Sequence, residues 1–309
     1  MSEPSPLILG CMGFGGSWDR NPISARDRRA AEAALEAALS VGISCFDHAD
    51  IYTHGKSEEV FGQILGTRPD LRRQIRIQTK CGIRLADGDR VKNYDLSAAH
   101  ILQSVEGSLQ RLGVEVIDVL LLHRPDPLLD PHEIAEAWRR IVRDGKALRL
   151  GVSNMSAAQM RWLTATTDQP LVANQVEMSL AKRDWLEAGS CFNSDQGTSS
   201  SEWAGTIEYC RSEGIELQAW GALAQGRYVR AQAADPATSL LVRELADKYE
   251  ASCEAILLAW LMRHPAAIRP VIGSLNPERI IGCAQAVRIR LDRQEWYRLY
   301  QTARGAELP

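Results

Sequence analysis

Short apolar runs rich in β-branched residues alternate with longer amphipathic stretches along the whole chain, and this alternation limits the possible folds most strongly. The runs expected to be strands span residues 7–10, 43–47, 75–80, 116–122, 148–152, 172–176, 217–219 and 269–272. The helical patterns between them lie at residues 27–40, 58–65, 98–112, 131–143, 157–166, 202–213, 240–249 and 277–286. Because strands and helices alternate without consecutive hairpins, the sheet should be parallel. Eight such units predict an α/β fold, a (β/α)8 TIM barrel, in which residues 1–309 form a single domain.

Three segments need separate interpretations. Residues 180–201 are polar and rich in Gly, Ser and Asn, which predicts a long loop after the sixth strand. Residues 292–305 predict an added C-terminal helix. The glycine cluster at residues 13–16 follows the first strand, but Trp18 stands where a dinucleotide-binding fingerprint needs its third glycine. A doubly wound sheet is therefore disfavoured, and the cluster is expected to be a loop.

The charge balance excludes several classes of partner. Lys and Arg total 36 against 39 Asp and Glu, a formal charge of -3, which is too balanced for a generic nucleic-acid or polybasic membrane surface. The N-terminus lacks a basic region before an apolar stretch, and no apolar run is long enough to span a membrane. The seven cysteines are scattered without a Cys-x-x-Cys pair, which favours reduced thiols in the cytoplasm and argues against structural zinc. The sequence leaves open a monomer or a weak homo-oligomer.

Titratable side chains stand at the ends of three successive predicted strands. In a barrel of this type, catalytic groups come from the carboxyl ends of the strands and the loops that follow them. Asp47 ends the second strand and Tyr52 follows it, Lys80 ends the third strand, and His123 follows the fourth. We therefore expect these four side chains at one rim of the barrel.

Together these four groups can act as a proton-donating device. Tyr52 would be the general acid, since a phenol with a pKa of about 10 is protonated at neutral pH. Lys80 beside the phenol would lower its pKa, and Asp47 would pair with Lys80 and keep it charged. His123 would direct a ring nitrogen at the oxygen of a substrate carbonyl.

A purely structural interpretation is also possible for each residue taken alone. Asp47 and Lys80 could form an ordinary salt bridge at the rim, Tyr52 could pack on a helix, and His123 could anchor a loop. Their placement on three successive strand ends favours the catalytic interpretation.

Seven motifs, in order along residues 7–286, resemble those of the aldo-keto reductase superfamily. They are Phe-Asp-His-Ala-Asp-Ile-Tyr (46–52), Thr-Lys-Cys-Gly (79–82), Leu-Leu-His-Arg-Pro-Asp (121–126), Gly-Val-Ser-Asn (151–154), Asn-Gln-Val-Glu (174–177), Ala-Trp-Gly-Ala-Leu-Ala-Gln-Gly (219–226) and Gly-Ser-Leu-Asn-Pro-Glu-Arg-Ile (273–280). Within the superfamily the chain is similar to bacterial oxidoreductases with His-Arg-Pro-Asp-Pro after the fourth strand. The resemblance implies a (β/α)8 fold, NADPH-dependent reduction of aldehydes or ketones, and Asp47, Tyr52, Lys80 and His123 as the catalytic residues.

The resemblance also implies a set of cofactor-binding residues. They are Met12, Ser153, Asn154, Gln175, Trp220, Gly221, Ala222, Leu223, Gly226, Gly273, Ser274 and Arg279. Polar side chains at 153, 154 and 175 would hold the nicotinamide carboxamide, and Trp220 would stack on the ring. The loop at residues 221–226 would bind the pyrophosphate through backbone N–H groups, and Ser274 and Arg279 would bind the 2'-phosphate at a helix N-terminus.

Two positions depart from the family pattern. Many members carry a Glu and an Asn at positions that contact the adenine, whereas this chain has Gly282 and Cys283 there. Ser274 and Arg279 still favour NADPH over NADH, and no acidic residue near this helix start suits a free ribose hydroxyl. The strength of that preference stays open, as does the native substrate.

The remaining candidates have alternative interpretations. Trp18 and Trp185 fall in predicted loops, where they could line an apolar substrate pocket. Cys81 could be a redox-sensitive thiolate beside Lys80, or a small buried hydrophobe. His48 and His54 lack a third ligand, so no metal site is expected.

Two other functions differ in what they require of the sequence. A regulatory or redox-sensing subunit that binds NADPH and turns over slowly would have the same four residues. A metal-dependent barrel hydrolase would need His-x-His after the first strand, where residues 10–13 instead read Gly-Cys-Met-Gly.

Overall fold

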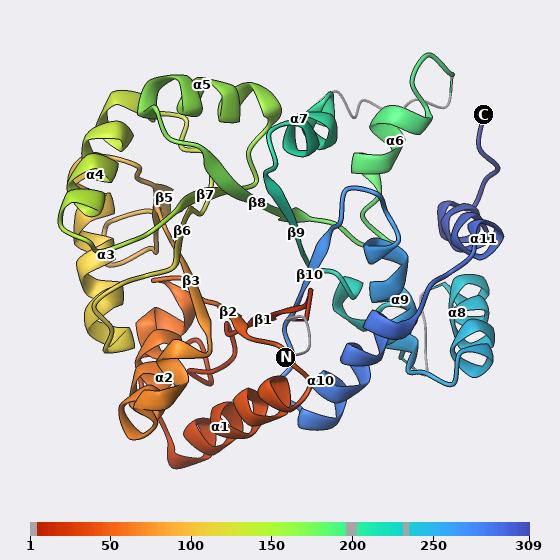
Figure 1. The fold of residues 1–309 in the computed structure, drawn as a ribbon, viewed down its shortest axis with the longest axis horizontal. Coiled ribbons are helices and arrows are strands. Elements are labelled where there is room, and N and C mark those ends of the chain that lie inside the picture. The colour runs from red at the N-terminus through yellow and green to blue at the C-terminus, as the bar shows by residue number, and fades with distance from the viewer. Residues whose placement is uncertain (1–4, 196–202, 231–234) are drawn as a thin grey trace.

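Eight parallel strands close into a barrel, and helices surround it (Figure 1). The computed structural model describes residues 5–195, 203–230 and 235–309. The barrel strands are β1 (Ile8–Gly10), β2 (Cys45–Asp47), β3 (Arg76–Cys81), β6 (Val119–Leu122), β7 (Leu150–Ser153), β8 (Leu171–Glu177), β9 (Glu216–Trp220) and β10 (Arg269–Ile272). Their order around the barrel is β1-β10-β9-β8-β7-β6-β3-β2. This order confirms the predicted (β/α)8 barrel.

The strands read as apolar runs because both of their faces are covered. All four residues of β6 are buried, one face against the helices and the other inside the barrel. The same holds for the middle of β9, where Leu217 and Ala219 are buried on one face and Gln218 on the other. Polar residues on the inward face are therefore exceptions that require hydrogen-bond partners.

The helices fill the gaps between the strands in sequence. They are α1 (Ala25–Ser40), α2 (Lys56–Thr67), α3 (Ala98–Leu112), α4 (Pro131–Arg143), α5 (Ala157–Thr167), α6 (Asp184–Ser190), α7 (Thr206–Ser212), α8 (Pro236–Lys248), α9 (Cys253–Met262), α10 (Pro277–Ala284) and α11 (Arg293–Arg304). Ser24 caps α1 in a capping box with Asp27, and Asp292 caps α11, which confirms the added C-terminal helix. No helix within the described ranges is both long and apolar enough to cross a membrane.

Two helices were not expected from the sequence. The predicted loop at 180–201 is wrong in part, because residues 184–190 form the short helix α6. Helix α9 packs against α8, α10 and β10, and its residues 255–261 are all buried. A helix that is apolar on all sides lacks the periodicity by which surface helices are recognised.

The structure also corrects the prediction for Trp185. This residue lies on α6 with only 3% of its surface exposed, and its ring centroid is 6.0 Å from that of Trp260. Its indole Nε1 donates a hydrogen bond to the carbonyl oxygen of Lys182. Trp185 therefore belongs to an aromatic part of the core and does not line a substrate pocket.

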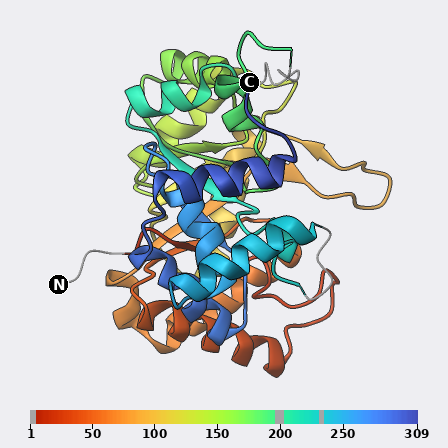
Figure 2. The same ribbon diagram turned by 90° about the vertical axis from the view of Figure 1, so that its right-hand side faces the viewer.

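A two-stranded hairpin that the alternation did not predict projects from the barrel (Figure 2). It consists of β4 (Ile83–Arg84) and β5 (Asn93–Tyr94), which pair antiparallel after β3. An ion pair between Arg20 and Asp87 joins the tip of this hairpin to the loop after β1. Loops after β1 and β3 thus meet on the side of the barrel where the strands end.

Helices α2 and α3 pack closely enough that Gly62 has no room for a side chain. A Cβ atom at Gly62 would lie 2.2 Å from the carbonyl oxygen of Arg111. We predict that Gly62→Ala lowers the free energy of unfolding by about 1–3 kcal/mol, because backbone atoms of α3 must move. Urea denaturation measures this change.

Gly66 on the same helix provides the matched control, since a Cβ there meets nothing within 4 Å. Gly66→Ala should leave the protein as stable or raise its stability by about 0.4–1 kcal/mol. Equal effects of the two substitutions would contradict the proposed contact.

Candidate active site

The structure brings Asp47, Tyr52, Lys80 and His123 together at the carboxyl ends of neighbouring strands. Asp47 ends β2, Lys80 is the penultimate residue of β3, and His123 directly follows β6. These three strands are adjacent in the barrel. Tyr52 begins a 3-10 helix, η1 (Tyr52–Gly55), in the loop after β2. The convergence predicted from the sequence is therefore present.

A buried ion pair lies at the centre of this group. The Nζ of Lys80 is 2.6 Å from Oδ2 of Asp47, and the two side chains are 1% and 2% exposed. The same Nζ donates to the carbonyl oxygen of His48 at 2.8 Å. The other carboxylate oxygen, Oδ1, accepts a hydrogen bond from Nε2 of Gln78 at 2.7 Å. Both charges therefore have hydrogen-bond partners, as buried charges require.

The ion pair keeps Lys80 positively charged. Burial by itself lowers the pKa of this ammonium, but the charge of Asp47 and the contact with Tyr52 raise it above its ordinary value. The predicted role of Asp47 in holding Lys80 charged agrees with this balance.

Tyr52 lies between Lys80 and His123. The Nζ of Lys80 is 5.0 Å from the centroid of the Tyr52 ring. The rings of Tyr52 and His123 are 6.0 Å apart and nearly perpendicular, at 81°. The phenol ring is thus flanked by a cation and an imidazole.

The net pKa of Tyr52 differs from the prediction. Burial raises it most, Lys80 lowers it through its charge and a hydrogen bond, and Asp47 raises it, so the pKa of Tyr52 lies above its ordinary value. The expected effect of Lys80 is present, but it only partly offsets burial. Tyr52 is consequently fully protonated at neutral pH in this structure.

His123 is neutral for related reasons. Burial lowers its pKa well below the ordinary value, and the nearby charges of Lys80, Arg124 and Lys92 lower it further. Its backbone N–H donates to the carbonyl oxygen of Cys81 at 2.8 Å, which fixes the start of the loop after β6. A neutral imidazole can donate a hydrogen bond to a carbonyl oxygen without adding charge.

The loop that carries Tyr52 has an unusual backbone. Thr53 and His54 both have left-handed conformations, with φ of 47° and 59°. The buried Oγ1 of Thr53 donates to the carbonyl oxygen of Tyr52 at 2.7 Å. Strained residues of this kind persist where the surroundings fix the backbone, and here they hold the phenol in place.

The residues predicted to hold a nicotinamide lie on the next strands of the same rim. Ser153 ends β7 and donates through Oγ to the carbonyl oxygen of Gln175 at 2.7 Å. Asn154 has a positive φ of 59°, and its Nδ2 donates to Oγ of Ser153 and to the carbonyl oxygen of His123. The Nε1 of Trp220 donates to Oδ1 of Asn154 at 3.0 Å. Hydrogen bonds therefore connect this group to the catalytic candidates.

The predicted phosphate-binding residues lie at the ends of β9 and β10. In the loop at residues 221–226, the N–H groups of Ala224 and Gly226 donate to the carbonyl oxygens of Gly221 and Leu223, so the predicted pyrophosphate contact falls to other amides of this loop. Asn276 caps α10, and the side chain of Arg279 is exposed in the first turn. Their use by a cofactor stays a prediction.

Other predicted contacts are placed as follows. Met12 is half-exposed in the loop after β1, and its carbonyl oxygen accepts from Oγ of Ser57. Gly273 is exposed, and Ser274 accepts through Oγ from the N–H of Asn276. Cys283, at the second adenine position, is buried in the core, so its side chain cannot contact a bound nucleotide.

Trp18 remains a candidate for the substrate pocket. It is 49% exposed, and its ring lies 6.0 Å from that of His54, two residues after Tyr52. Trp18 therefore stands beside the loop that carries the phenol.

The redox and metal alternatives receive no support from the geometry. Cys81 is buried, and burial, followed by the charges of Asp50 and Glu58, raises its pKa well above the ordinary value. A thiol of this kind is not a reactive thiolate. No group of three metal-binding side chains occurs among the residues that the structure describes.

Three residues near the site were not predicted from the sequence. The guanidinium of Arg124 lies 5.7 Å from the centroid of the Trp220 ring. Gln78 and Gln218 are fully buried inside the barrel. Gln78 precedes Lys80 by two positions and Gln218 precedes Trp220 by two, so the strand period alone would have placed them on the same inward face.

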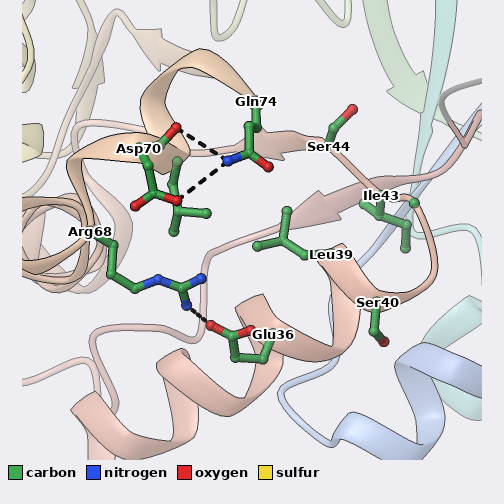
Figure 3. Close-up of a pocket in the computed structure, with 10 residues that line it drawn as sticks. Glu36, Leu39, Ser40, Ile43, Ser44, Arg68, Asp70 and Gln74 are labelled. Atoms are coloured by element: carbon green, nitrogen blue, oxygen red, sulfur yellow. Dashed lines mark hydrogen bonds and ion pairs between the residues drawn. The ribbon is translucent and has the colours of Figure 1, made fainter. Parts of the chain in front are cut away.

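A surface hollow of about 680 Å³ lies at the other end of the barrel (Figure 3). Ile43 and Ser44 line it just before β2 begins, so it opens on the side of the amino ends of the strands. Glu36 and Arg68 form an ion pair across it. The hollow is thus separate from the candidate active site.

The chain belongs to the aldo/keto reductase family, whose family model matches residues 6–304. The 6-dehydroglucose reductase of Agrobacterium fabrum is 36% identical over 310 residues, which cover 99% of this chain and 96% of that protein. An aldo/keto reductase from Klebsiella pneumoniae, solved in complex with NADP and acetate, is 26% identical with a TM-score of 0.73, over 96% of this chain and 90% of that chain. The thermostable aldo-keto reductase Tm1743, solved with the inhibitor epalrestat, has a TM-score of 0.76 at 24% identity, over 96% and 94%, and shares the fold. The resemblance inferred from the motifs is confirmed, and the chain is an oxidoreductase of this family.

The buried ion pair leads to a prediction about stability. Lys80→Met should lower the free energy of unfolding by about 3–5 kcal/mol, because the carboxylate of Asp47 stays buried without its counter-ion. Denaturant titration at neutral pH measures this loss.

Arg298→Met is a suitable control, because it removes an ion pair with Glu244 in which both side chains are more than half exposed. Its cost should stay below about 1 kcal/mol. A loss of similar size in both variants would contradict the stabilising role of the buried pair.

Proposed function

We propose that this protein reduces aldehyde or ketone carbonyls to alcohols with NADPH, with Tyr52 as the general acid. The observation that carries the proposal is the convergence of Tyr52, Lys80, Asp47 and His123 beside Trp220. A protonated phenol lies beside a fixed cation and a neutral imidazole, and Asn154 links the carbonyl oxygen of His123 to the indole of Trp220 by hydrogen bonds.

The residues present fit a nicotinamide cofactor. Trp220 is partly exposed, and its indole is fixed by Asn154, so a ring can stack on it in a defined orientation. The Oδ1 of Asn154 accepts one hydrogen bond and has a second lone pair for the NH₂ of a carboxamide. The exposed Arg279 beside Ser274, at the N-terminus of α10, suits a phosphate group. The Klebsiella relative was solved with NADP, which supports the same choice of cofactor.

Bound NADPH would supply a hydride to the carbonyl carbon. His123 donates a hydrogen bond to the carbonyl oxygen and aligns the C=O bond. Tyr52 transfers its phenolic proton to the same oxygen, so hydride and proton together convert the carbonyl into an alcohol. The negative charge left on Tyr52 lies beside the ammonium of Lys80 until solvent returns a proton.

The raised pKa of Tyr52 determines the pH dependence. A phenol with a pKa above its ordinary value holds its proton throughout the neutral range, so proton donation fails only at alkaline pH. Carbonyl reduction should therefore be constant near neutral pH and decline on the alkaline side.

We predict that Tyr52→Phe lowers kcat by about 10²–10⁴-fold, because the proton donor is removed while the ring remains. The affinity for NADPH should be nearly unchanged. Steady-state kinetics and a fluorescence titration of NADPH measure the two quantities.

Tyr94→Phe on the exposed hairpin is the matched control and should keep wild-type activity. Equal kcat values for Tyr52→Phe and the wild type would exclude Tyr52 as the general acid.

A second prediction concerns the 2'-phosphate. Arg279→Met should weaken NADPH binding by about tenfold, because a charge-assisted hydrogen bond is lost, and should leave NADH binding unchanged. Binding titrations with both cofactors measure the difference, and Arg26→Met, an exposed cation on α1, serves as control. Equal weakening of NADPH and NADH would contradict the assignment of Arg279.

The substrate can be sought with a panel of carbonyl compounds. One relative is named for the reduction of 6-dehydroglucose, so hydroxylated aldehydes belong in the panel beside simple aldehydes, ketones and diones. NADPH consumption with any of them supports the proposal. Binding of NADPH without consumption would favour the regulatory or redox-sensing alternative.

A further inference from the structure

Three buried glutamines form a hydrogen-bonded chain across the inside of the barrel. Gln78 on β3 and Gln218 on β9 exchange two hydrogen bonds, with Nε2–Oε1 distances of 2.8 and 2.9 Å. Gln175 on β8 donates through Nε2 to Oε1 of Gln218 at 3.0 Å. Strands β3 and β9 are not neighbours in the barrel, so the chain crosses its interior. We call Gln78, Gln218 and Gln175 the glutamine relay.

Each of the first two glutamines also donates to a carboxylate. The Nε2 of Gln78 donates to Oδ1 of Asp47 at 2.7 Å, on the side of the active site. The Nε2 of Gln218 donates to Oε1 of Glu216 at 2.7 Å, toward the amino ends of the strands. The pair formed by Gln78 and Gln218 is therefore flanked by one carboxylate on each side.

Glu216 remains ionised in this position. Burial by itself raises its pKa, but Arg269, with Nη1 2.8 Å from Oε2, and the charge of Arg76 lower it below the ordinary value. An ionised carboxylate can only accept hydrogen bonds. The carboxylates of Asp47 and Glu216 thus each require that the glutamine beside them presents its NH₂ group.

These two requirements fix the direction of every amide in the relay. If Gln78 were turned over, its oxygen would face Oδ1 of Asp47, and if Gln218 were turned over, its oxygen would face Glu216. Such buried oxygen–oxygen contacts are costly. The Oε1 of Gln218 must therefore accept, and Gln175 must offer its Nε2 to it. The Oε1 of Gln175 is then the acceptor end of its amide that faces away from Gln218, and it accepts no hydrogen bond from any residue in the described ranges.

We propose that Gln78 and Gln218 are positioning residues that orient the amide of Gln175, so that its oxygen accepts a hydrogen bond from the NH₂ group of the nicotinamide carboxamide. This inference rests on the proposed NADPH-dependent reduction. The carboxylate of Asp47 then has two roles. It stabilises the charge of Lys80, and through Gln78 and Gln218 it determines which way the amide of Gln175 faces a bound nicotinamide.

A double-mutant cycle between Gln218 and Gln175 tests the relay. Gln218→Met removes the relay contacts at nearly constant volume and should weaken NADPH binding about five- to tenfold, the loss of one oriented hydrogen bond. Gln175→Met should weaken binding to a similar extent. The double variant should bind NADPH no more weakly than Gln175→Met alone, because the amide that Gln218 orients is already absent.

The kinetic readout separates positioning from a general loss of structure. In Gln218→Met, KM for NADPH should rise about five- to tenfold while kcat at saturating NADPH changes little. Gln218→Asn, which keeps an amide but is too short to reach Gln78 and Gln175 together, should show the same pattern. It also provides the test if the methionine variant does not fold.

Thr79→Val is the matched control for loss of a buried hydrogen bond on β3. Its Oγ1 donates to Glu58 outside the barrel interior, so the variant should lose thermal stability but keep the wild-type affinity for NADPH. Additive effects in the cycle, or unchanged NADPH affinity in a folded Gln218 variant, would overturn the relay. A wild-type protein that binds no NADPH would instead refute the proposed function.

Discussion

The ion pair between Lys80 and Asp47 is the constraint to which the rest of the candidate site conforms. Two charges with 1% and 2% exposure cannot persist inside a barrel unless their remaining hydrogen-bonding groups have partners. The carbonyl oxygen of His48 and the amide of Gln78 provide these partners. The strand register places Asp47 opposite Gln78, so the pair depends on the correct alignment of β2 and β3.

The same cation shifts the pKa values of the groups around it, although burial has the larger effect on both. The charge of Lys80 opposes the rise of the Tyr52 pKa that burial causes, and it adds to the fall of the His123 pKa. Burial thus keeps a protonated phenol and a neutral imidazole side by side, and the positive charge of Lys80 lowers the pKa of both. Gln78 of the glutamine relay donates to Asp47. The charge of this carboxylate therefore orients amide groups as far as β8 and β9, the strands where the nicotinamide would lie.

The sequence predicted the barrel and the convergence of the four catalytic candidates because both depend on strand ends, which apolar runs mark clearly. It did not predict α9, because a helix that is buried on all faces has no helical period of apolar residues. It also did not predict α6, a helix of seven residues within a polar segment. The prediction for Trp185 was wrong because α6 was not predicted. A residue assigned to a loop in fact lies on this helix and packs on the core. The raised pKa of Tyr52 required the structure, because the effect of burial depends on distances that spacing along the chain does not give.

The ammonium of Lys80 acts electrostatically on the phenol of Tyr52 and lowers its pKa. Direct titration of Tyr52, by NMR of ring-labelled tyrosine assigned through a phenylalanine variant, tests it in the free protein. We expect the Tyr52 pKa to lie above its ordinary value in the wild type and to be higher still when Lys80 is replaced by methionine. A Tyr52 pKa at or below its ordinary value, or one that does not respond to the loss of Lys80, would contradict it.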